Sequence, residues 1–270
     1  MQTTPHASGQ LEVAGTNPAD LSLFPAGGWR TTNSPSTGLA SVSVDVAGGD
    51  LILGLSWVGD GGVVSWSPAK MENLYADAAG KAVALAGTCD LGALRCRVQA
   101  NVTQGLLVLA AFNQFPPGSG RTDFFSRSFF YPVGDDLDGA GGRLDMTGLA
   151  PRATSTIWPA VDPAPLAGTW VNTNPSSIGI VRYVISVRGT RVVAGALMAD
   201  GRDLGEAAAE IYAKDGEPPE PMAFLATFDA GDREFGAQAR LNLGLLVVAY
   251  FCRMKDGQTN YYTREFYRRA

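Results

Sequence analysis

Short apolar runs separated by turn-forming residues extend over nearly the whole chain, and this pattern predicts many β-strands. In the first half we expect eight strands, at residues 29–33, 39–46, 51–57, 63–66, 81–88, 94–103, 106–112 and 123–131. Clusters of Gly, Asp and Pro separate most of these runs. Residues 67–75 fit either a short helix capped by Ser67 or a loop followed by a strand.

The second half of the chain repeats the pattern of the first. Three unlike residues recur 141 positions later: Trp29, Asn33 and Gly38 match Trp170, Asn174 and Gly179. The segment beginning at Gln99 matches the one beginning at Gln238 at an offset of 139, and residues 125–129 match 262–266 at 137. This drift places small insertions or deletions in loops, as expected for one fold used twice.

The repeats suggest a division into an N-terminal arm at 1–23, repeat 1 at 24–131, a linker at 132–164 and repeat 2 at 165–270. About eight short strands per repeat suit an up-and-down antiparallel barrel, whose closure removes exposed sheet edges. The interior of such a barrel is either filled by side chains or holds one small ligand. We therefore predict an all-β fold of two tandem barrels related by internal duplication.

The net charge of −5 lies outside the repeats, because residues 24–131 carry 7 basic and 7 acidic side chains and residues 165–270 carry 12 of each. Without a basic excess, we expect no nucleic-acid partner and no attachment to anionic membranes. No apolar run reaches the roughly 18 residues of a membrane span, and the N-terminus lacks the regions of a signal peptide. We expect a cytoplasmic protein.

The sequence gives little support for catalysis or metal binding by histidine or cysteine. The only histidine is His6 in the arm, which argues against Ser-His-Asp catalysis and His-based metal sites. Cys89 and Cys96 have the spacing to face each other across a hairpin, but free thiols are favoured, together with Cys252. The acidic run at 135–139 lacks the spacing of a calcium loop. We expect neither a metal nor a cofactor.

The stretch Gly168-Thr-Trp170 with a late Arg264, repeated as Gly27-Gly-Trp29 with Arg127, resembles the signature of the calycin superfamily, which includes lipocalins and avidins. The resemblance implies that each barrel is calycin-like. It also implies a structural role for the four residues Trp29, Arg127, Trp170 and Arg264, with each Arg packed across its Trp at the closed barrel end. No tryptophan follows Trp170, which argues against avidin-like biotin binding in repeat 2.

The favoured function is the binding of a small apolar or aromatic molecule in a barrel cavity. Its candidate ligand-binding residues are Trp57, Trp66, Gln99, Phe112, Tyr183, Met198, Gln238 and Tyr250. One alternative is a metal-free cyclase or isomerase of secondary metabolism that encloses and orients its substrate, with the weak catalytic candidates Glu72, Tyr75, Glu210 and Tyr212. Another is a structural or oligomerisation module with filled barrels.

Residues 106–112 and 245–251 are apolar at nearly every position, whereas a strand with one solvated face alternates. We expect both faces of these strands to be buried. They pack either one barrel on the other or the chain on a second copy in a homo-oligomer.

Overall fold

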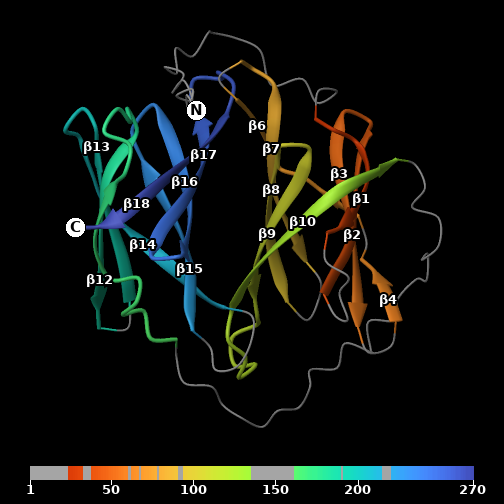
Figure 1. Ribbon diagram of the computed structural model, residues 1–270, viewed down its shortest axis with the longest axis horizontal. Coiled ribbons are helices and arrows are strands. Elements are labelled where there is room, and N and C mark those ends of the chain that lie inside the picture. The colour runs from red at the N-terminus through yellow and green to blue at the C-terminus, as the bar shows by residue number, and fades with distance from the viewer. Residues whose placement is uncertain are drawn as a thin grey trace, which may run out of the picture.

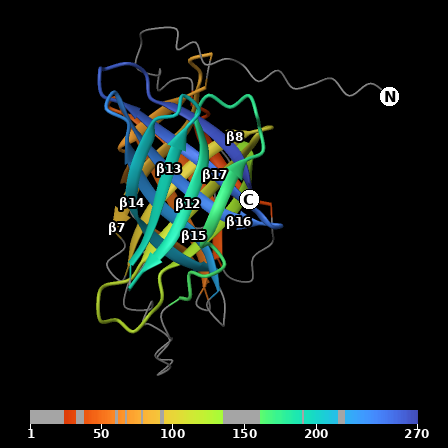
Figure 2. The same ribbon diagram turned by 90° about the vertical axis from the view of Figure 1, so that its left-hand side faces the viewer.

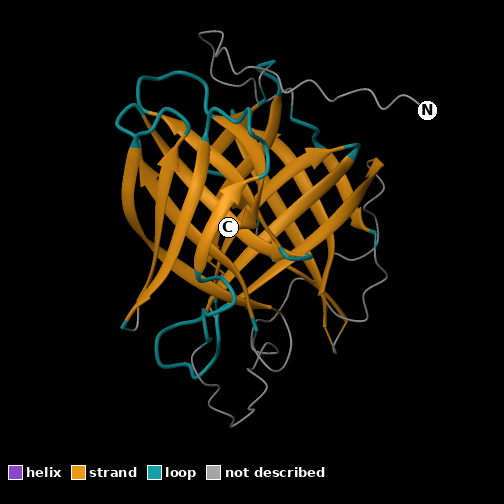
Figure 3. Cartoon of the chain, turned by 60° about the vertical axis from the view of Figure 1, so that its left-hand side comes forward, coloured by secondary structure: helices purple, strands orange, loops and turns teal. Residues whose placement is uncertain are grey.

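The chain is described by a computed structural model that covers residues 24–32, 38–59, 62–66, 68–77, 79–90, 94–134, 161–189, 191–214 and 220–270. All regular secondary structure in these ranges is β-strand, which confirms the predicted all-β class (Figure 3). The described residues accordingly offer no helix with the length and apolarity to span a membrane. His6, Ser67 and the acidic run at 135–139 lie outside the described residues.

The first half of the chain contributes ten strands and the second half eight. The first ten are β1 (Gly27–Thr31), β2 (Gly38–Ala47), β3 (Asp50–Gly59), β4 (Gly62–Ser65), β5 (Ala69–Lys70), β6 (Asn73–Ala76), β7 (Ala82–Asp90), β8 (Arg95–Thr103), β9 (Leu106–Gln114) and β10 (Phe124–Gly134). The remaining eight are β11 (Gly168–Asn172), β12 (Ile180–Arg188), β13 (Arg191–Met198), β14 (Asp203–Lys214), β15 (Pro221–Asp229), β16 (Arg233–Asn242), β17 (Leu245–Met254) and β18 (Tyr261–Arg269).

Hydrogen bonding closes each half into a ring of antiparallel neighbours (Figures 1 and 2). In the second half, every strand from β11 to β18 pairs with the next, and β11 also pairs with β18. In the first half, β1 pairs with both β2 and β10. We call the two sets ring 1 (β1–β10) and ring 2 (β11–β18).

The fourth strand of ring 1 is broken into the short strands β4, β5 and β6, whereas the fourth strand of ring 2 is the single long strand β14. β3 pairs with β4 and then β5, and β6 pairs with β7. Between them, the Met71 amide donates to the Leu51 carbonyl at 2.8 Å and the Glu72 amide to the Ala86 carbonyl at 3.0 Å. The segment after Ser67 is therefore loop and strand, and the alternative of a short helix was wrong.

Strands β9 and β17 are buried on both faces, which explains their continuous apolar sequence. In β9, Leu107 and Leu109 belong to the core of ring 1, whereas Ala110 and Phe112 belong to a cluster that includes residues of ring 2. In β17, the alternating residues likewise divide between the core of ring 2 and a second shared cluster. The two strands lie between the rings of one chain.

The rings contact each other twice in equivalent ways. β10 pairs in parallel with β14, where Phe124 lies opposite Ala213, and β18 pairs in parallel with β6, where Tyr261 lies opposite Ala76. Both members of the second pair are 137 positions from their counterparts in the first. The rings are thus related by an approximate two-fold axis, and their contact is self-complementary like that of a symmetric dimer.

Aromatic side chains pack at both of these equivalent contacts between ring 1 and ring 2. In one cluster, Phe112 lies 4.9 Å from Tyr212 with ring planes at 77°, and 5.0 Å from Phe125. In the other, Phe251 lies 5.1 Å from Tyr75 at 84° and 5.2 Å from Tyr262. Edge-to-face pairs add to the stabilisation given by area burial alone.

Phe251→Ala removes the centre of one aromatic cluster, and we expect it to lower the free energy of unfolding by about 3–5 kcal/mol because a cavity is left between the rings. Urea unfolding monitored by tryptophan fluorescence measures the change. Phe266→Ala on neighbouring β18, where the side chain is 42% exposed, is the matched control with an expected loss below about 1 kcal/mol. Equal losses in the two variants would show that the rings do not depend on this contact.

Candidate functional site

A cavity of about 90 Å³ lies at the end of ring 2 where the loop between β11 and β12 joins the ring. Its walls come from that loop and from strands β12, β13, β16, β17 and β18. The lining residues are Ile178, Gly179, Ile180, Met198, Arg233, Phe235, Tyr250, Tyr261, Thr263 and Glu265.

The wall of this cavity is largely apolar and well packed. Ile180, Met198 and Phe235 are all buried and belong to the core of ring 2. Ile178 is 60% exposed, so an apolar side chain also stands at the mouth. The cavity therefore extends from the core of the ring to an exposed apolar side chain.

Two side chains of opposite charge, Arg233 and Glu265, line the cavity. Arg233 donates from Nη1 to the Tyr261 hydroxyl at 3.2 Å and forms an ion pair with Asp232 at 2.5 Å, which raises the pKa of the guanidinium. Glu265 accepts from the Ser177 hydroxyl at 3.2 Å and from the Asn172 amide at 3.3 Å. The site thus offers both a cation and a hydrogen-bonded carboxylate.

Below the cavity, three buried tyrosines form a directed chain of hydrogen bonds. Tyr183 donates to Tyr250 at 2.7 Å, and Tyr267 donates to the Ile180 carbonyl at 2.7 Å. Each hydroxyl has one proton, so the 2.5 Å contact between Tyr250 and Tyr267 is donated by Tyr250. Burial raises the pKa of all three phenols above the ordinary value, which keeps them neutral.

The other end of ring 2 is closed by a tryptophan. Trp170 donates from Nε1 to the Leu166 carbonyl at 2.9 Å, and the guanidinium of Arg269 lies 4.9 Å from the centre of its ring. Arg269 also donates to the Pro165 carbonyl at 2.6 Å. An arginine is therefore packed across Trp170.

That arginine is Arg269, and the resemblance had implied Arg264. Arg269 lies directly opposite Trp170 in the pairing of β11 with β18. Arg264 is five positions earlier, and because side chains alternate along a strand it points to the opposite face. In ring 1, the guanidinium of Arg127 lies 4.4 Å from the centre of the Phe129 ring, whereas the resemblance had implied that it packs on Trp29. Trp29 is buried in the core.

The other predicted residues are distributed over four places. Tyr183, Tyr250 and Met198 are inside ring 2, and the latter two line its cavity. Trp57 and Trp66 stack on each other in ring 1, with centroids 6.0 Å apart. Phe112, Tyr75 and Tyr212 lie between the rings, and Glu72 is exposed.

The hydroxyl of Tyr212 donates to Glu210 at 2.8 Å, and Arg97 of ring 1 forms an ion pair with the same carboxylate at 3.3 Å. This pair therefore belongs to the contact between the rings and does not face the interior of ring 2. No group of three or more His, Cys, Asp or Glu side chains is placed to hold a metal within the described ranges. Cys89 and Cys96 face each other in the pairing of β7 with β8 and are free, buried thiols.

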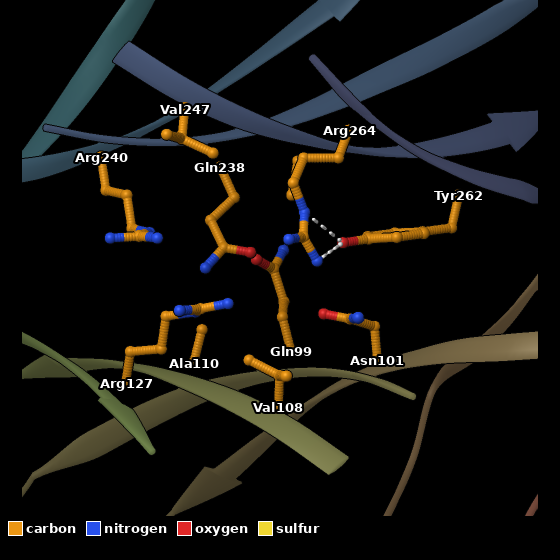
Figure 4. A pocket seen from close by; sticks show the side chains of 11 residues that line it. Gln99, Asn101, Val108, Ala110, Arg127, Gln238, Arg240, Val247, Tyr262 and Arg264 are labelled. Carbon is orange, nitrogen blue, oxygen red and sulfur yellow. Dashed lines mark hydrogen bonds between the residues drawn. The ribbon is translucent and has the colours of Figure 1, made fainter. Parts of the chain in front are cut away.

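The two matched glutamines, Gln99 and Gln238, line a separate polar pocket between the rings (Figure 4). They point toward each other from β8 and β16. Sequence reasoning missed Arg233 and Glu265 of the cavity in ring 2 and Arg240 of the pocket between the rings. The sequence feature that could have identified them is a charged residue within a partly apolar strand.

No protein-family model matches the chain, and no curated protein matches it. Among solved structures, a protein of unknown function from the DUF3598 family of Nostoc punctiforme PCC 73102 is 12% identical with a TM-score of 0.38, over 94% of this chain and 100% of that chain. Kievitone hydratase from Nectria haematococca is 8% identical with a TM-score of 0.22, over 97% of this chain and 95% of that chain. Scores this low carry no argument about activity or ligand.

The raised phenol pKa values predict a loss of stability in alkaline solution. Below pH 10 the phenols are neutral in the folded and unfolded chains alike; above it only the unfolded chain loses the protons, so the free energy of unfolding falls. Tyr183→Phe removes one titrating group, and we expect a fall shallower by about 1.4 kcal/mol per pH unit. Urea unfolding between about pH 8 and pH 11.5 tests this, and parallel curves for the variant and the parent would contradict it.

Proposed function

We propose that the chain is a small-molecule-binding protein built from two calycin-like barrels, and that its ligand enters the end cavity of ring 2. The observation that carries the proposal is the composition of this cavity. Buried apolar side chains form the wall, and two phenols, one guanidinium and one carboxylate converge on the same space. A mostly apolar cavity with a few converging polar groups is the usual form of a ligand site.

The volume limits the part of the ligand that is enclosed. Sites for drug-sized ligands measure roughly 300–1,000 Å³, and this cavity measures about 90 Å³. We infer that a fragment about the size of one small ring is enclosed, and that the remainder of the ligand lies against the exposed Ile178 at the mouth. The ligand is then a small amphiphile with an apolar or aromatic body.

The polar groups favour recognition of a hydrogen-bonding end. Arg233 and the Tyr261 hydroxyl are joined by a hydrogen bond at 3.2 Å on one side of the cavity, and Glu265 is held by Ser177 and Asn172 on another. The base of the cavity is the neutral Tyr250, whose proton is already donated to Tyr267. Tyr250 therefore presents an oxygen that accepts a hydrogen bond from the ligand.

Neutral phenols also favour binding over proton transfer. A general base works best when its pKa is near the operating pH. Burial moves the pKa of Tyr250 and Tyr261 upward, away from that range. These groups orient a ligand by hydrogen bonds, so we place binding ahead of the cyclase or isomerase alternative.

Thr263→Phe places a large side chain in the cavity, and we expect it to abolish ligand-induced increases in melting temperature across a library of small aromatic alcohols, acids and amines. Val184→Phe, at a position on β12 that is 45% exposed, is the matched control and should keep the response of the parent protein. Thermal-shift measurements identify responding compounds, and isothermal titration calorimetry then gives their affinities.

Native mass spectrometry of the protein purified from its own host identifies a retained ligand directly. A discrete small molecule that Thr263→Phe no longer retains supports the proposal. If no compound raises the melting temperature of the parent and its native mass is that of the chain alone, the proposal fails and the structural-module alternative is favoured.

A further inference from the structure

The pocket between the rings is lined by equivalent residues of the two repeats. Four pairs are identical residues at matching positions: Gln99 and Gln238, Val108 and Val247, Ala110 and Ala249, and Arg127 and Arg264. The remaining lining residues are Asn101, Arg240 and Tyr262. The pocket therefore lies on the approximate two-fold axis, and both rings contribute to it (Figure 4).

Three arginines face this small space without a carboxylate among the lining residues. Arg127 comes from β10 of ring 1, whereas Arg240 and Arg264 come from β16 and β18 of ring 2. The guanidinium of Arg264 donates to the Tyr262 hydroxyl at 3.4 and 3.3 Å. The carboxylate of Glu210, also at the contact between the rings, is engaged by Arg97, Gln114 and Tyr212.

Two of the three guanidinium groups in the pocket have no hydrogen-bond acceptor in the described part of the chain. Arg127 is held against Phe129 by its guanidinium face, and no hydrogen bond joins Arg127 or Arg240 to another described residue. A guanidinium carries five N–H donors, so a half-buried one without an acceptor is costly.

The pKa values of the arginines also indicate positive charge that is not neutralised in the pocket. Burial and, after it, the neighbouring charges of Arg240 and Arg264 together lower the pKa of Arg127 to about 10. Burial and the charge of Arg264 also lower the pKa of Arg240. Like charges that are partly removed from water repel one another, and an anion between them relieves this repulsion.

We propose that this pocket binds one small inorganic anion, of the size of chloride or nitrate, between the guanidinium groups of Arg127, Arg240 and Arg264. The pocket volume is about 30 Å³, enough for roughly two water molecules or one such ion. The ion takes hydrogen bonds from arginines of both rings and so joins them. This site is separate from the cavity in ring 2 and does not depend on the function proposed for it.

One pair of matching positions differs between the two repeats, and this difference suggests the variant that tests the site. Asn101 in ring 1 stands where ring 2 has Arg240, so the third positive charge comes from ring 2 alone. Arg240→Asn makes the two repeats alike at this position and leaves two guanidiniums in the pocket. Arg191→Asn removes an exposed arginine outside the pocket and controls for net charge.

The experiment compares melting temperatures in sodium chloride, nitrate and phosphate with those in sodium gluconate at the same ionic strength, which separates specific binding from screening. We expect chloride or nitrate to raise the melting temperature of the parent and of Arg191→Asn. The affinity of Arg240→Asn for the same anion, measured by calorimetry, should fall by about tenfold or more, in line with the loss of a charge-assisted hydrogen bond.

A phosphate response that exceeds those of chloride and nitrate would overturn the assigned ion size. Equal anion responses in the parent and in Arg240→Asn, or no specific response in the parent, would overturn the site itself. If Arg240→Asn does not fold, crystals of the parent soaked in bromide decide, because an anomalous peak between the three arginines supports the site and its absence overturns it. Thr263→Phe should keep the anion response, so failure of the ligand proposal and failure of this one are distinguishable.

Discussion

The burial of both faces of β9 and β17 is the constraint on which the rest of the structure depends. One face of each strand closes the core of its own ring, and the other packs against the opposite ring. Solvation of the outer faces would expose Phe112, Phe251 and their aromatic neighbours to water. The two rings are therefore stabilised as a pair, through contacts that one ring alone does not supply.

The approximate two-fold relation has an electrostatic consequence. In a self-complementary contact, residues that lie at the axis meet their own counterparts, so equivalent positive charges come together there. Arg127 and Arg264 are such a pair, and Arg240 adds a third charge from one side. A duplicated chain can change one repeat alone, as at Asn101 and Arg240, which a symmetric dimer of identical subunits cannot do.

Within ring 2, the two ends differ in the groups that close them. Trp170 and Arg269 close one end by stacking and by hydrogen bonds to backbone carbonyls. At the other end, the chain of three tyrosine hydroxyls fixes the floor of a cavity whose rim stays open.

The sequence by itself determined the all-β class, most strand positions and the internal duplication, because period-two patterning, turn residues and shared offsets are local or directly comparable features. It also indicated that 106–112 and 245–251 are buried on both faces. It left the segment after Ser67 open between helix and strand, since short apolar stretches fit either element.

Only the tertiary structure decided which residues meet. Gln99 and Gln238 were expected in barrel interiors, but they line the space between the rings, and Arg269 takes the position over Trp170 expected for Arg264. A shift of one residue in a strand reverses the face on which a side chain lies. Because the register comes from pairing with distant strands, neither site was readable from the chain alone.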